Sequence, residues 1–90
     1  MPLNIGEVTT FANAKADKEQ VLKIGEECME VFSAWEDWQS TLDPELLPHL
    51  VDEIADTIQA CANLATALGV DDMRGAMAEC EERNRERGRL

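Results

Sequence analysis

Two short acidic clusters contain the residues of this sequence that could do chemistry together. The first is residues 26–30 (EECME) and the second is residues 53–56 (EIAD). On helices, residues three apart share a face, so Glu27 can converge with Glu30, and Glu53 with Asp56. Two such helices packed side by side would collect four carboxylates, whose mutual repulsion calls for a cation. Hard oxygen ligands in that number suit Mg²⁺, with Mn²⁺ as a substitute.

The surroundings of these acids bear on the same question. At about 100° per residue, Glu27 lies at the edge of the apolar stripe of its helix. Glu53 and Asp56 lie at the start of the most apolar segment of the chain. Charged groups in such places are expected to be paired or metal-bound. The alternative is a solvated acidic face, because E-x-x-E is common in Glu-rich helices. Spacing alone leaves both interpretations open.

Four helical segments are expected to position these residues, and they predict an all-α, four-helix-type bundle in a single domain, residues 1–90. The segments are residues 5–14, 18–39, 48–68 and 72–85. Their expected start and stop signals are Asn4 as a cap, Asp17 with Gln20 as a capping box, Pro48 at a first helical position, Gly69 as a stop and Asp71 as a cap.

The third segment is apolar nearly all round, so it is predicted to be the most buried helix. A chain of 90 residues buries limited surface of its own. We therefore expect a homo-oligomer, either a dimer or a tetramer. Further side chains are expected to face a core or an interface: Phe11, Trp35 and Trp38, and Met73, Ala76, Met77 and Cys80 of the last helix.

The net charge of −11 argues against a nucleic acid polymer or an anionic membrane as partner. Four of the eight basic residues fall in the last eight positions. The three cysteines, Cys28, Cys61 and Cys80, form no C-x-x-C pair, which favours reduced, mostly buried thiols in a cytoplasmic protein. The N-terminus lacks a basic region followed by an apolar run, so no signal peptide is expected.

The order of the motifs resembles the MazG-like nucleotide pyrophosphohydrolases, relatives of the dimeric dUTPases and the phosphoribosyl-ATP pyrophosphohydrolases. Their shared pattern is E-E-x-x-E and then E-x-x-D on adjacent helices; here 22 residues separate Glu30 from Glu53. Lys23-Ile24-Gly25 before the first motif and the Ala/Leu-rich helix after the second also match. Residues 83–89 (RNRERGR) resemble the N-x-x-R-G-R close of the small members. The resemblance covers residues 21–90.

The resemblance implies metal-dependent cleavage of a nucleoside triphosphate between the α- and β-phosphates, giving the monophosphate and pyrophosphate. It implies Glu27, Glu30, Glu53 and Asp56 as metal ligands. Glu26, which is not among these ligands, would bind a second metal or activate water. Glu26 and Glu27 would together be the catalytic residues.

Several residues are candidates for substrate contact. The arginine-rich end offers Arg83, Asn84 and Arg87 to phosphate oxygens, with a frayed basic tail as the alternative. Lys23 is expected to pair with Glu27, or else to reach phosphate. Trp38 is suited either to packing or to stacking on a base. His49 is assigned to the surface, and Gln59 and Asn63 to hydrogen bonds with a base or with neighbouring backbone.

Two other functions stay open on this sequence. One is a non-catalytic helical interaction module or nucleotide sensor with the same fold. The other is an enzyme acting on phosphoribosyl-ATP, which the acidic motif does not exclude. The preferred base and sugar are not encoded in any motif.

Overall fold

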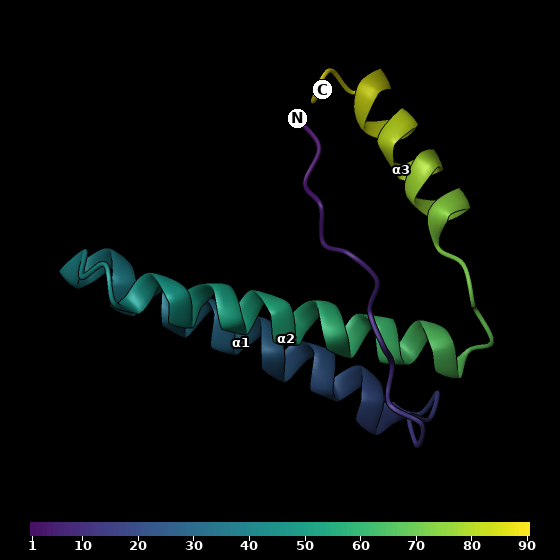
Figure 1. The fold of residues 1–90 in the computed structure, drawn as a ribbon, viewed down its shortest axis with the longest axis horizontal. Coiled ribbons are helices and arrows are strands. Elements are labelled where there is room, and N and C mark those ends of the chain that lie inside the picture. Colours follow the sequence, from purple (N-terminus) through teal and green to yellow (C-terminus); the bar gives the residue numbers. More distant parts are fainter.

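The computed structural model describes all 90 residues, which form three helices and no strand. Helix α1 spans Lys18–Thr41, α2 spans Leu46–Ala67 and α3 spans Arg74–Glu86. α1 and α2 form an antiparallel hairpin, and α3 stands away from it without contacting either helix (Figure 1). The all-α prediction is confirmed, but a single chain forms no four-helix bundle. No helix has the length and apolarity that crossing a membrane would need.

The expected first helix, residues 5–14, is wrong. Asn4 caps nothing: its Oδ1 accepts a hydrogen bond from the Gly6 amide at 2.8 Å, in a turn where Gly6 has a φ of +71°. The Phe11 amide donates to Asn63 Oδ1 at 3.0 Å, and Gln59 Nε2 donates to the Thr9 carbonyl at 3.0 Å. The backbone groups of Thr9 and Phe11, which would bond within a helix, thus bond to side chains of α2 instead. Residues 8–11 cross the hairpin as a strap (Figure 1).

Helix α1 begins as predicted. Asp17 is its N-cap, and Asp17 Oδ1 accepts from the Gln20 amide at 3.0 Å. The reciprocal half of a capping box is absent, because Gln20 Nε2 donates instead to the Ala60 carbonyl of α2 at 3.1 Å. The same residue pair therefore starts α1 and ties it to α2. The helix ends at Thr41, and Leu42, its C-cap, takes a left-handed φ of 51°.

Helix α2 begins two residues before Pro48, where the sequence predicted its first position. Asp43 Oδ1 accepts from the Glu45 amide at 2.9 Å, and the Asp43 carbonyl accepts from the Leu46 amide at 3.0 Å. This turn leads directly into the helix. Pro48 is tolerated because the amides of a first turn have no intrahelical partner. At the other end, α2 stops just before Gly69, as predicted, and Gly69 takes a left-handed φ of +91°.

Helix α3 begins at Arg74, and the predicted cap, Asp71, plays no part. Asp72 Oδ1 accepts from the Arg74 amide at 2.9 Å, and the Asp72 carboxylate also binds the Arg74 guanidinium at 2.7 Å. This double contact holds residue 72 outside the helix. The side chains expected to face inward remain accessible: Met73 is 46% and Met77 58% exposed, because no helix of the same chain lies against them.

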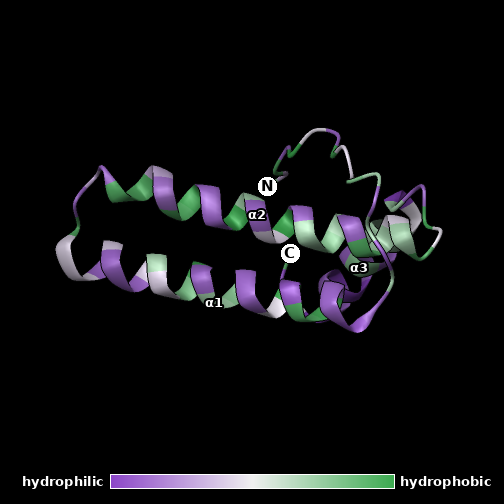
Figure 2. Ribbon diagram, turned by 90° about the horizontal axis from the view of Figure 1, so that it is seen from below, coloured by the Kyte–Doolittle hydropathy of each residue, from purple (hydrophilic) through white to green (hydrophobic).

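The core of one chain is thin. Its buried apolar residues are Ala34, Leu50 and Ala60. Phe11, expected in the core, is 58% exposed, and the expected burial of Cys28 and Cys61 is also wrong. α2 does hold three of the five buried residues, but several of its apolar side chains are exposed, namely Leu47, Val51, Ile54, Ala55 and Cys61. Hydrophobic positions lie along both helices in Figure 2, while two helices can cover only one face of each other.

We expect Asn63→Ala to release the strap. Asn63 is 3% exposed, and its Oδ1 accepts both the Phe11 amide and Gln59 Nε2. Losing this acceptor should lower the free energy of unfolding by about 1 kcal/mol per lost bond. Amide hydrogen exchange at Phe11 should accelerate, as measured by mass spectrometry or NMR. Thr66→Ala, at an exposed position of the same helix, is the control. Unchanged exchange at Phe11 would show that Asn63 does not hold the strap.

Candidate metal centre

Three of the predicted carboxylates meet across the helix pair. Glu27 and Glu30 come from α1 and Glu53 from α2, and one oxygen of each lies within 4.8 Å of the others. The first two are three residues apart, so α1 presents them on one side. The antiparallel packing brings Glu53 opposite them. The prediction that both motifs converge at one place is confirmed for these three residues.

Glu27 is the buried member, with 6% of its surface exposed. Its Oε1 lies 2.9 Å from Lys23 Nζ, which confirms the expected pair. This hydrogen bond lowers the pKa of Glu27 and raises that of Lys23, although burial of Glu27 opposes the first shift. The second oxygen, Oε2, is buried without any hydrogen-bond partner. Glu27 is therefore held as a carboxylate with one oxygen unsatisfied.

Glu53 is the corresponding residue on α2, with a longer contact to its neighbour. Its side chain is 15% exposed, and its Oε1 lies 3.6 Å from His49 Nε2. Its Oε2 is buried and has no partner. His49 is 57% exposed, which confirms its predicted surface position, but its contact with Glu53 was not predicted. The signal was the i, i+4 spacing of His49 and Glu53, which places both on one side of α2.

Glu30 is the exposed member, and its pKa is raised. The main cause is a proton that Glu30 can share with Glu53, followed by sharing with Glu27 and by repulsion from the Glu27 charge. Without such a proton, the buried second oxygens of Glu27 and Glu53 have no donor. Three converging carboxylates cannot all ionise at their ordinary pKa, since each new charge meets two others. A cation among them would offset the repulsion that raises the pKa of Glu30.

Asp56, the fourth predicted ligand, lies outside the trio. It lines an adjoining cavity of about 260 Å³ together with Glu27, Lys23, Phe11, Gln59 and Asn63. Glu27 thus belongs to both the cluster and the cavity. Glu26, the spare carboxylate, lies 3.8 Å from Lys23 Nζ with its side chain 66% exposed. Lys23 therefore contacts both glutamates of the EE pair.

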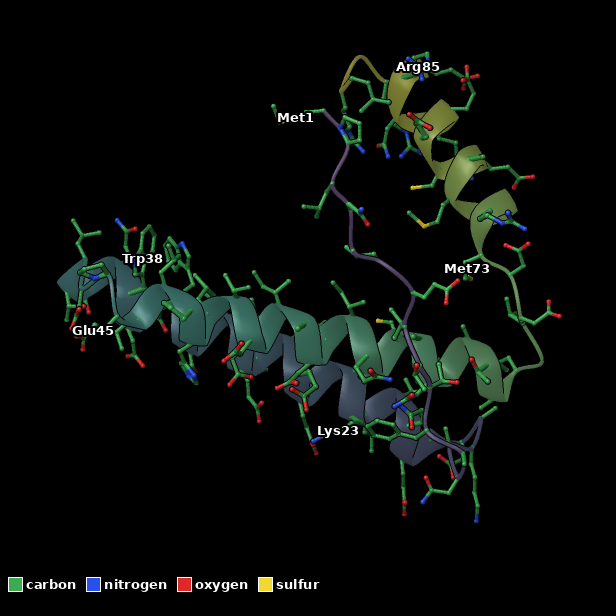
Figure 3. All side chains as sticks on the ribbon, viewed as in Figure 1. Met1, Lys23, Trp38, Glu45, Met73 and Arg85 are labelled. Atoms are coloured by element: carbon green, nitrogen blue, oxygen red, sulfur yellow. The ribbon has the colours of Figure 1, made fainter.

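The remaining substrate candidates lie away from the cluster. Trp38 is two turns beyond Glu30, about 12 Å along α1, and is half-buried. Arg83 and Asn84 lie on α3 and Arg87 caps it, and α3 contacts neither helix of the hairpin. In Figure 3, Arg85 near the end of α3 is far from Lys23. Asn84 Oδ1 accepts instead from Arg89 Nη1 at 3.0 Å.

The chemistry of the trio fits a hard divalent cation. Two buried oxygens without partners, Glu27 Oε2 and Glu53 Oε2, belong to different helices and border the same cluster. An unsatisfied buried carboxylate oxygen is costly, and a cation supplies what the protein does not. Mg²⁺ is bound through a few carboxylates while it keeps several waters, so three such ligands are a sufficient set.

No family model, no curated protein and no solved structure matches this chain.

We expect Glu30→Gln to stabilise the metal-free protein at neutral pH. The folded-state pKa of Glu30 lies above its ordinary value of 4.5, so folding favours the protonated form. That stabilisation is complete below pH 4.5 and is lost as the pH rises through the raised pKa. The advantage of the neutral amide over Glu30 should accordingly grow from acid to neutral pH.

The measurement is urea unfolding with a chelator present, at several pH values between 4 and 8. Glu36→Gln is the control, because Glu36 is exposed on α1 and belongs to no ion pair. If Glu30→Gln and Glu36→Gln change stability alike at every pH, the carboxylates do not repel one another as the distances indicate.

Proposed function

We propose that this protein is a Mg²⁺-dependent nucleotide pyrophosphohydrolase, with Mn²⁺ as a possible substitute ion. It would cleave nucleoside triphosphates between the α- and β-phosphates to give the monophosphate and pyrophosphate. The observation that carries this proposal is the meeting of Glu27 and Glu30 of α1 with Glu53 of α2, one oxygen of each lying within 4.8 Å of the others. Glu27 and Glu53 also each have one buried oxygen without a partner. The motif resemblance to MazG-like enzymes supplies the reaction class.

In this proposal Glu27, Glu30 and Glu53 hold the cation, and Asp56 approaches it from the cavity. Bound Mg²⁺ would neutralise triphosphate charge and polarise the phosphorus under attack. Glu26, exposed and next to the buried ligand in sequence, would accept a proton from water in this proposal. Lys23 keeps Glu27 ionised and also lines the cavity, so its ammonium group can meet a phosphate there.

The cavity beside the trio is the proposed place for the rest of the nucleotide. Its wall includes the ring of Phe11, on which a base could stack. The amides of Gln59 and Asn63 line it as well, although the strap uses the Asn63 oxygen. A protein of net charge −11 attracts a polyanion only through cations or a local basic group. Lys23 is the only basic side chain in this cavity.

The decisive variant is Glu53→Gln. It should abolish pyrophosphate release from a panel of nucleoside triphosphates with Mg²⁺, while the metal-free protein remains folded because one repulsive charge is gone. Mg²⁺ should raise the melting temperature of the unmodified protein, since a ligand at a hundredfold excess over its Kd stabilises the folded state by about 2.7 kcal/mol. The variant should lose most of this response.

Asp52→Asn is the matched control, an exposed acid beside Glu53 on the same helix. It should keep both the activity and the Mg²⁺ response. A Glu53→Gln variant that remained fully active would overturn the metal centre. An unmodified protein that responds to Mg²⁺ but releases no pyrophosphate would favour the non-catalytic alternative, a nucleotide sensor or interaction module.

We further propose that the chain works as a homo-oligomer, either a dimer or a tetramer. Its radius of gyration is 15.2 Å, against about 12 Å for a compact domain of this length. Its accessible surface is 7286 Å², whereas a compact 10 kDa monomer exposes roughly 5,200 Å². The excess of about 2,000 Å² per chain, or about 4,000 Å² for two chains, falls within the total area that obligate homodimers bury. Arg83, Asn84 and Arg87 would then reach phosphates only from a neighbouring chain.

Sedimentation equilibrium at micromolar concentration should therefore give at least twice the chain mass of 10.0 kDa. The same species should persist with and without Mg²⁺, because the exposed apolar surface does not depend on the cation. A stable single chain across this concentration range would contradict the oligomer and leave the metal centre untouched.

A further inference from the structure

The two oxygens of the Glu27 carboxylate have different surroundings. Oε1 accepts a hydrogen bond from Lys23 Nζ at 2.9 Å, whereas Oε2 is buried and has no partner. Only 6% of Glu27 is exposed, so water has little access to this carboxylate. A cation that binds Glu27 while the Lys23 bond stays intact therefore has only Oε2 available.

The other two carboxylates of the trio are not held in this way. Glu53 Oε1 lies 3.6 Å from His49 Nε2, which is longer than a hydrogen bond. Glu30 takes part in no ion pair. Both of these residues can thus offer either oxygen or both to a cation, and Glu27 is the one ligand that a neighbouring ammonium group limits to a single oxygen.

The number of available oxygens matters because Mg²⁺ and Ca²⁺ use carboxylates differently. Mg²⁺ requires near-octahedral geometry and keeps several waters, so one oxygen from each carboxylate is sufficient. Ca²⁺ takes about six to eight oxygens and often binds both oxygens of one carboxylate. To bind Glu27 in that way, Ca²⁺ would have to displace Lys23 and break a charge-assisted hydrogen bond to a buried group. Binding of Mg²⁺ through Oε2 alone leaves that bond in place.

We propose that Lys23 determines which cation the centre prefers: by occupying Glu27 Oε1 it limits this ligand to one oxygen and so favours Mg²⁺ over Ca²⁺. This inference rests on the proposed metal centre and adds a residue that selects its ion. Lys23 acts through Glu27 and does not touch the cation, so it is a positioning residue. The selectivity arises from a cost imposed on the competing ion, while the bonds to Mg²⁺ stay as they are.

The test is the ratio of the Kd for Ca²⁺ to the Kd for Mg²⁺, measured by calorimetric titration without nucleotide. Lys23→Met should shift this ratio about tenfold toward Ca²⁺, a typical effect of removing a group that orients a metal ligand. Both ions carry the same charge, so a change in net charge alone alters the two affinities alike.

Lys18→Met is the matched control, because Lys18 is an exposed lysine of the same helix and belongs to no ion pair. It removes the same charge but frees no carboxylate oxygen, so it should leave the ratio unchanged. A folded Lys23→Met variant with the ratio of the unmodified protein would overturn the inference and leave the metal centre in place.

A second measurement needs no variant, since Lys23→Met leaves a buried carboxylate without its partner and can unfold the chain. The chain has three lysines, and Lys15 and Lys18 belong to no ion pair. In ¹⁵N NMR of the ammonium groups, the Lys23 signal should stay hydrogen-bonded and slow to exchange with water when Mg²⁺ is added, with the other two lysines as references.

Release of the Lys23 ammonium group by Mg²⁺ would overturn the inference, because Glu27 would then have both oxygens free. An unmodified protein that binds neither cation would overturn the inference together with the metal centre. A protein that prefers Mg²⁺ through Lys23 but releases no pyrophosphate would uphold the inference and overturn the proposed enzyme alone.

Discussion

Glu27 lies on the seam between α1 and α2, where a carboxylate loses most of its hydration. Lys23, one turn earlier, binds Oε1 in place of water, but Oε2 has no partner. Glu53 shows the same pattern from the other helix, with His49 near its first oxygen. The position of the whole candidate centre follows from these two partly satisfied carboxylates and from the packing that buries them.

The same packing leaves many apolar side chains of the single chain exposed. Two helices can shield one side of each other, and here that seam carries small residues and a carboxylate instead of a large apolar core. The apolar side chains that would form an ordinary core lie on a separate side.

The strap contributes a third element to this arrangement. Gln59 and Asn63 are polar residues on a largely apolar helix, and they bind backbone atoms of Thr9 and Phe11. By doing so they hold Phe11 at the edge of the cavity that Glu27 and Asp56 also line. A segment without secondary structure therefore forms part of the wall beside the acidic cluster.

Helix-forming composition, the Asp17 cap and the Gly69 stop were readable in the sequence, because they act over neighbouring residues. The i, i+3 spacing of Glu27 and Glu30 and the pairing of Lys23 with Glu27 were readable for the same reason. Only the tertiary structure decided that Glu53 completes the cluster while Asp56 faces the cavity, since this depends on the rotation of α2 against α1. It also decided that residues 5–14 form no helix and that α3 packs on nothing in its own chain. Those outcomes depend on hydrogen-bond partners and packing surfaces about 50 residues away in sequence, such as Asn63 for Phe11, which no local pattern specifies.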